Sequence, residues 1–208
     1  MVPAVLVLGL VAEGTAWWAV TTRSVSIWAS VVPVAGAMGI ASLALGPPPL
    51  YRGVSPAIAC LAGVAAGTGL YVATRGFLLA IRGWPPFREH AILIYLRQGT
   101  VPVALAVLLS VGVSAVGEEL FWRGLFRAHA VSGAPVASAV VSWAGFVLAN
   151  LPSLNLAIGA AALVGGAVWT VLALWSGGVL ASLLCHGLWT GLMLMAPVVD
   201  ARKGLAGT

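Results

Sequence analysis

The residues best suited to chemistry in this sequence concentrate in one short segment, GEELFWRG, at positions 117–124. Glu118 and Glu119 are adjacent carboxylates, and Arg123 follows Glu119 by four residues. On a helix, Glu119 and Arg123 share one face in the acid-before-base order that favours an ion pair. Glu118 lies about 100° further round the helix. We therefore expect Arg123 to neutralise Glu119 and to leave Glu118 available for proton transfer.

Two later helices carry the other polar groups of interest. Asn150 follows Phe146 by four residues, and Thr190 follows His186 by the same spacing, so each pair shares one helix face. Taken singly, a buried Asn or His in a bundle usually bonds a neighbouring helix, and Thr bonds its own backbone. Together with Glu118, they supply a carboxylate, an amide and an imidazole, which is a combination typical of hydrolytic sites.

Composition identifies the kind of protein that must position these groups. Hydrophobic residues make up 61% of the chain and charged residues 7%, with a mean hydropathy of +1.08. These values predict one all-α membrane domain over residues 1–208, a polytopic transmembrane bundle of about seven or eight spans. We expect spans near 3–20, 27–45, 54–74, 100–116, 134–149, 154–175 and 179–197. Gly63 and Gly67 have the GxxxG spacing that allows close helix approach.

Charge outside the spans is mostly basic. The net charge is +5, but the ten basic residues are scattered over loops without a stripe, so no nucleic-acid partner is expected. Residues 75–98 alternate arginines with aromatic and aliphatic residues, which predicts an amphipathic segment on an anionic membrane surface. Contact with a substrate tail is the alternative for this segment. Glu13, an acid within the first span, is expected to have a packing role rather than a catalytic one.

The order of the polar residues resembles the three motifs of the CPBP family (Abi, type II CAAX endopeptidases) of intramembrane proteases. That family carries EExxxR, FxxxH, and HxxxN or HxxxD. Here residues 118–125 read EELFWRGL, Asn150 is followed by Leu-Pro, and Ser-Gly-Gly at 176–178 precedes His186. The resemblance covers about residues 100–197, which would form a protease-like core.

The resemblance implies hydrolysis of a peptide bond in or at the edge of the membrane. Glu118 would activate water, Glu119 and Arg123 would hold the helix, and His186 with Thr190 would stabilise the oxyanion. The expected catalytic set is therefore Glu118, Glu119, Asn150, His186 and Thr190, with Arg123 in a structural ion pair. A substrate groove is expected at Trp122, Phe146 and Trp189.

The sequence departs from the family pattern at two of these positions. Asn150 stands where the family has histidine, and Thr190 where it has Asn or Asp. A zinc site would have to rely on Glu118, Glu119 and His186, with a single nitrogen ligand, so zinc is disfavoured and we expect no cofactor. An amide cannot take a proton at neutral pH, but it can orient a water or donate to an oxyanion while a carboxylate acts as base.

Several alternatives stay open at this point. A catalytically silent relative that binds membrane substrates or acts as a scaffold would also explain Asn150, and a small transporter could use buried charges. A thiol nucleophile at Cys185 is disfavoured because adjacent helix positions diverge by about 100°. The expected partners are the lipid bilayer and a membrane-anchored protein or peptide, whether a prenylated tail, a bacteriocin leader or a sorting signal. The Lys-poor, Ala- and Val-rich composition favours a bacterial inner membrane.

Overall fold

The computed structural model describes residues 1–197, and regular structure in that range is entirely helical. Six of the described helices are long and apolar enough to cross a membrane, and a shorter apolar helix, α11 (Leu180–Met195), follows them. The six are Val2–Thr22, Ile27–Leu45, Pro56–Ala80, Val103–His129, Pro135–Ser153 and Leu156–Ser176. The predicted helical membrane bundle is confirmed. At 16 residues, α11 is about 24 Å long and shorter than an ordinary span.

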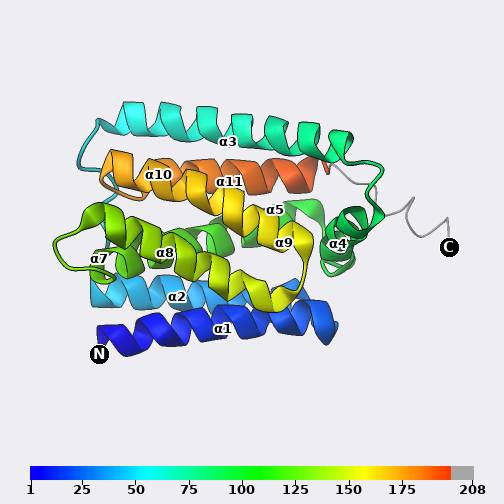
Figure 1. The fold of residues 1–208 in the computed structure, drawn as a ribbon, viewed down its shortest axis with the longest axis horizontal. Coiled ribbons are helices and arrows are strands. Elements are labelled where there is room, and N and C mark those ends of the chain that lie inside the picture. Colours follow the sequence, from blue (N-terminus) through cyan, green and yellow to red (C-terminus); the bar gives the residue numbers. More distant parts are fainter. Residues whose placement is uncertain (198–208) are drawn as a thin grey trace.

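The helices lie roughly parallel to one another (Figure 1). α1 (Val2–Thr22) and α2 (Val31–Leu45) form one side, and α3 (Pro56–Ala80) forms the opposite side. Between them lie the helix of residues 103–129, then α8 (Pro135–Asn150), α10 (Gly166–Ser176) and α11. α11 packs along α3, and α10 packs against both α8 and α11. The helices that carry the sequence motifs are therefore the inner ones.

The helix of residues 103–129 changes its winding around Glu118. α5 (Val103–Leu109) leads into a π-helical stretch, η2 (Ser110–Ala115), and a second one, η3 (Glu119–Phe126), follows the short α6 (Val116–Glu118). α7 (Arg127–His129) completes this helix. π-Helical turns are rare and occur frequently at functional sites. This winding could not be predicted from the sequence, because apolar residues occur on every side of the helix.

Glycines allow the close helix contacts that hold the inner helices. A Cβ on Gly63 would lie 2.6 Å from the Ala181 carbonyl oxygen, and one on Gly67 would lie 2.8 Å from that of Cys185. Real Cβ atoms do not approach so closely, so α3 and α11 meet at this GxxxG pair as its spacing predicts. Gly117, next to Glu118, packs in the same way on the backbone of α2 at Ala35.

The predicted amphipathic segment 75–98 has a different start. Residues 75–80 continue α3, and a turn then leads into α4 (Pro85–Leu96), at the same end of the bundle as the last turns of α3 (Figure 1). α4 buries Phe87 and Ala91. It is tied to α9 (Leu156–Ala160) because His90 Nδ1 accepts from the Leu156 N–H at 2.9 Å. α4 thus covers one end of the bundle.

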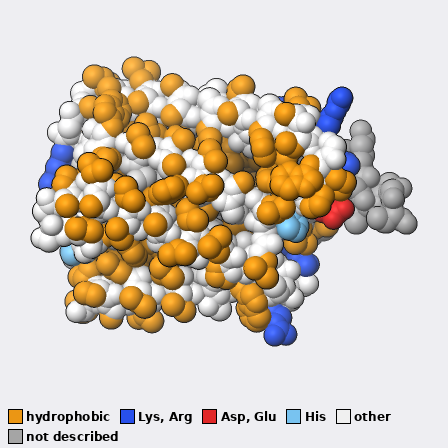
Figure 2. All heavy atoms as spheres, viewed as in Figure 1, with side chains coloured by type: hydrophobic (Ala, Val, Ile, Leu, Met, Phe, Trp, Pro, Cys, Tyr) orange, Lys and Arg blue, Asp and Glu red, His pale blue; other side chains and the backbone are white. Residues whose placement is uncertain are grey.

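Apolar side chains cover most of the face seen in Figure 2, and basic side chains stand at its two ends. Large exposed hydrophobic residues occur on several outer helices, including Ile40 on α2 and Leu61 on α3, which are 70% and 72% exposed. A contiguous apolar surface of this kind is stable in lipid and unfavourable in water. The chain is an integral membrane protein.

Candidate active site

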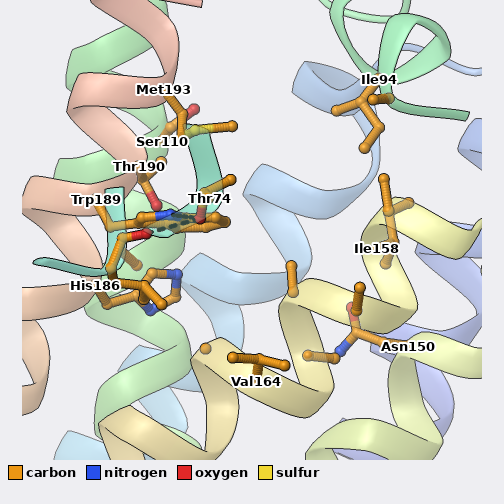
Figure 3. A pocket seen from close by; sticks show the side chains of 18 of the residues that line it. Thr74, Ile94, Ser110, Asn150, Ile158, Val164, His186, Trp189, Thr190 and Met193 are labelled. Atoms are coloured by element: carbon orange, nitrogen blue, oxygen red, sulfur yellow. Dashed lines mark hydrogen bonds between the residues drawn. The ribbon is translucent and has the colours of Figure 1, made fainter. Parts of the chain in front are cut away.

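A cavity of about 450 Å³ lies among the inner helices. Every predicted catalytic residue except Glu119 lines it: Glu118, Asn150, His186 and Thr190. His186 and Thr190 project from α11 on one wall, and Asn150 and Ile158 lie across the cavity from them (Figure 3). Most of the remaining wall is apolar. Three polar helix segments that are far apart in the sequence therefore meet in one place.

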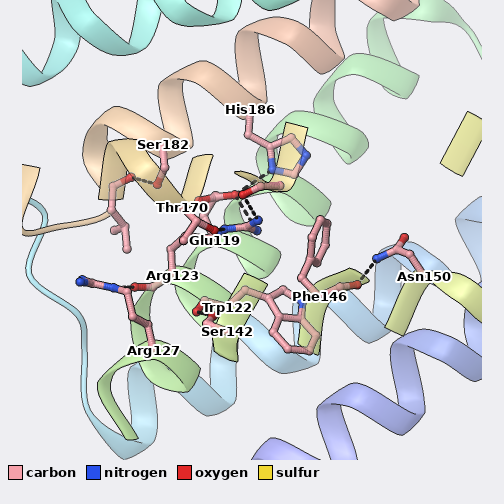
Figure 4. Close-up of polar contacts among 12 residues, drawn as sticks. Glu119, Trp122, Arg123, Arg127, Ser142, Phe146, Asn150, Thr170, Ser182 and His186 are labelled. Atoms are coloured by element: carbon pink, nitrogen blue, oxygen red, sulfur yellow. Dashed lines mark hydrogen bonds and ion pairs between the residues drawn. The ribbon is translucent and has the colours of Figure 1, made fainter. Parts of the chain in front are cut away.

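Glu119 lies behind the cavity wall and is fully buried. Arg123 Nη1 donates to Glu119 Oε1 at 3.2 Å, which confirms the predicted i, i+4 ion pair (Figure 4). The guanidinium group also donates to the Gly166 carbonyl at 3.1 Å and to the Thr170 hydroxyl at 3.4 Å. These bonds connect the ion pair to α10, so both charges are buried with partners.

His186 is held on two sides. Its Nδ1 lies 3.0 Å from Glu119 Oε1, and its ring stacks on Trp169 with 3.6 Å between ring centroids and 13° between planes. A carboxylate paired with Arg123 can only accept hydrogen bonds, so Nδ1 carries the proton in this contact. Nε2 is then the ring atom left for the cavity that His186 lines. Glu119 therefore orients the imidazole as well as pairing with Arg123.

Glu118 has different surroundings from its neighbour. It lines the cavity, is 7% exposed, and takes no part in the Arg123 network described above. The charges of Glu13, Arg123 and Glu119 act on it. Arg123 directs its hydrogen bonds to other groups, so Glu118 keeps its oxygens for whatever enters the cavity, as the helical spacing predicts.

Asn150 is 4% exposed and has a partner that the sequence did not reveal. Its Nδ2 donates to Glu13 Oε1 at 2.9 Å and to the Phe146 carbonyl oxygen at 2.9 Å. Glu13 Oε2 accepts from Trp122 Nε1 at 2.7 Å. Glu13 stands out in the sequence as the one acid in the first span. Nothing in its spacing indicates that its partner is Asn150, 137 residues later.

The predicted groove residues divide between the cavity and the core. Phe146 and Trp189 line the cavity, and Trp189 Nε1 donates to the Thr74 hydroxyl of α3 at 3.1 Å. Trp122, also expected in the groove, is instead fully buried beside Glu13 and is not among the lining residues. Its side chain points from η3 toward Glu13 of α1 and away from the cavity. Cys185 is likewise fully buried and outside the lining.

The side chains present fit a zinc site poorly. Among residues 1–197, no group of three His, Cys, Asp or Glu side chains is arranged to hold a metal ion. His186 supplies one imidazole and Glu118 one cavity-facing carboxylate, while Glu119 is bonded to Arg123 and His186. Catalytic zinc usually has three protein ligands.

Comparison with known proteins gives one match. The family model described as type II CAAX prenyl endopeptidase Rce1-like matches residues 100–192, from just before α5 into α11. This match agrees with the resemblance carried by the three motifs, and the matched stretch contains Glu118, Asn150, His186 and Thr190. No curated protein and no solved structure matches the chain.

Proposed function

We propose that this chain is an intramembrane endopeptidase related to the type II CAAX prenyl endopeptidase Rce1-like family, whose model matches residues 100–192. Its reaction would be hydrolysis of a peptide bond in a membrane-associated protein or peptide. One observation carries the proposal: Glu118, Asn150, His186 and Thr190 line one cavity within the bundle, and Glu119 behind them orients His186.

In the proposed first step, a water held by Glu118 and Asn150 attacks the scissile carbonyl carbon. Glu118 takes one proton of the water as its oxygen bonds to the carbon, and the carbonyl π electrons move onto the carbonyl oxygen. An amide cannot take this proton, so Asn150 contributes by holding the water rather than as a base. The result is a tetrahedral intermediate with a negative oxygen.

The oxyanion is stabilised from α11 in this mechanism. The Thr190 hydroxyl is one donor, and His186 Nε2–H is the second when the ring carries both protons. Glu119, hydrogen-bonded to Nδ1, holds the ring in place for this contact. When the C–N bond breaks, Glu118 returns its proton to the leaving nitrogen, so the products are a carboxylic acid and an amine and the enzyme is regenerated.

The apolar walls of the cavity favour a particular kind of substrate. Residues of α3, α4 and η5 (Ala161–Gly165) line the cavity beyond the polar groups, among them Leu70, Phe77, Phe87 and Ala161. A bulky apolar side chain or a lipid chain next to the scissile bond would meet walls there as apolar as the lipid that it leaves. A prenylated tail and an apolar leader peptide both have this character.

Cleavage of a transmembrane and lipid-modified peptide library by the protein purified in lipid tests the proposal. We expect the wild-type chain to cut at defined bonds, and a metal chelator to leave the rate unchanged. Loss of cleavage with chelator, restored by metal, would contradict the metal-free mechanism. If wild type cuts nothing while Asn150→His does, the chain is a silent relative that binds substrates and the proposal fails.

A further inference from the structure

The hydrogen bonds of Asn150 determine which of its atoms faces the cavity. Its amide nitrogen has two N–H donors, and both have partners: Glu13 Oε1 and the Phe146 carbonyl oxygen, each at 2.9 Å. The Phe146 carbonyl can only accept, so the assignment of nitrogen and oxygen in this amide follows from its partners. No described residue donates to Oδ1, and Asn150 lines the cavity.

Glu13 is well suited to hold this orientation. It is 2% exposed and receives one donor on each oxygen, Asn150 Nδ2 on Oε1 and Trp122 Nε1 on Oε2. Both oxygens of a carboxylate can accept, whereas a glutamine at this position would turn its N–H₂ group toward one of the two donors. Hydrogen bonds to a charged acceptor are stronger than neutral ones.

We infer that Glu13 is a positioning residue for the proposed hydrolysis: it fixes Asn150 with Oδ1 toward the cavity, where it accepts a hydrogen bond from the attacking water. Asn150 then has no donor left for an oxyanion. Of the two roles that an amide could have at this position, orienting the water is the one that the geometry allows. This inference rests on the proposed function.

The arrangement fixes the water in a productive way. One hydrogen of the water points to Asn150 Oδ1 and the other to Glu118, which takes it as the base, so a lone pair of the oxygen is directed to the substrate carbonyl. Glu13 belongs to α1, outside the stretch that matches the family model. A helix that the comparison does not reach therefore contributes to the site.

Glu13→Gln tests the inference because a glutamine has one acceptor oxygen for two buried donors. We expect kcat to fall by about tenfold or more with KM little changed, and Asn150→Ala to add no further loss in the double variant. Ser142→Ala is the matched control: it removes a buried hydrogen bond to the Trp122 carbonyl oxygen but none to Asn150. We expect the control to keep its kcat.

A second measurement does not depend on activity. In ¹⁵N-labelled protein in lipid discs, the Asn150 side-chain N–H₂ protons should exchange slowly in wild type and in Ser142→Ala, and quickly in Glu13→Gln. If Glu13→Gln does not fold, Glu13→Asp, which is one methylene shorter, replaces it. We expect Glu13→Asp also to lower kcat and to speed exchange of the Asn150 side-chain protons.

Unchanged exchange at Asn150, or additive effects of the two substitutions on kcat, would overturn the inference. If the wild-type chain hydrolyses no peptide, the proposed function fails by that result alone. The exchange experiment still decides in that case whether Glu13 holds the Asn150 amide.

Discussion

At the scale of single residues, two adjacent glutamates have different surroundings. Glu119 has Arg123 and His186 on one oxygen and no exposure, whereas Glu118 faces the cavity. The helix geometry alone separates them, since consecutive residues diverge by about 100°. This difference in contacts could be predicted from the sequence, because it depends on spacing within one helix.

Glu119→Gln is expected to damage stability and activity together. The substitution leaves the Arg123 guanidinium buried without its counter-charge, which costs about 3–5 kcal/mol when a buried pair is broken, and it weakens the hold on His186. Thermal unfolding in detergent and cleavage rate would measure the two effects. Glu89→Gln makes the same chemical change at an exposed position of α4 and should change neither. Equal unfolding temperatures for the two variants would contradict the role given to the ion pair.

The partner of Asn150 could not be predicted at this scale. Glu13 and Asn150 are 137 residues apart, and their contact depends on how α1 packs against α8. The sequence predicts only a packing role for Glu13, because a single acid in an apolar span has no local partner that would indicate a site. Trp122 lies in the core and not in the predicted groove for the same reason, because its hydrogen bond to Glu13 depends on the packing of α1.

At the scale of elements, the contact between α3 and α11 determines where His186 stands. Both glycines of the GxxxG pair lie against α11 backbone, next to the turn that carries His186. The spans themselves were predictable from apolar runs, and the helix of residues 27–45 has the predicted bounds. The end of α3 could not be predicted, because arginines can continue a helix. The π-helical turns could not be predicted either, because local winding depends on tertiary packing.

Two alanine substitutions on α3 should change stability in opposite directions. Gly67→Ala places a Cβ 2.8 Å from the Cys185 carbonyl oxygen, so α11 must move and stability falls, by about 1–3 kcal/mol. At Gly69 no atom lies within 4 Å of the added Cβ, and alanine should stabilise the helix by about 0.5–1 kcal/mol. Thermal unfolding of both variants in one detergent would measure this. A Gly67→Ala variant as stable as Gly69→Ala would contradict the observed packing.

At the scale of the whole molecule, the bundle encloses a largely apolar cavity that is lined by Glu118, Asn150, His186 and Thr190, inside a surface suited to lipid. Under the proposed function, an apolar substrate segment would reach the buried polar groups without leaving an apolar environment. The overall class could be predicted from composition, since 61% hydrophobic residues require a membrane. The cavity could not, because its walls come from nearly every helix.

Ala161→Phe should narrow the cavity and select against bulky substrates. Ala161 lines the cavity, whereas Leu163 on the same π-helical stretch is 49% exposed outside it. We expect Ala161→Phe to lower kcat/KM for substrates with a large apolar group by about tenfold relative to small ones, and Leu163→Phe to leave the ratio unchanged. The same ratio in both variants would show that substrates do not occupy this part of the cavity.

The most direct test of the central claim, that Glu118 activates the attacking water, is the single-turnover cleavage rate of Glu118→Gln in lipid against Glu89→Gln. Glutamine keeps the shape of the side chain but cannot take the proton of the water. The account predicts that Glu118→Gln folds normally, still binds substrate and cleaves at least about 10² times more slowly, while Glu89→Gln cleaves at the wild-type rate. A folded Glu118→Gln variant with the wild-type rate would contradict it.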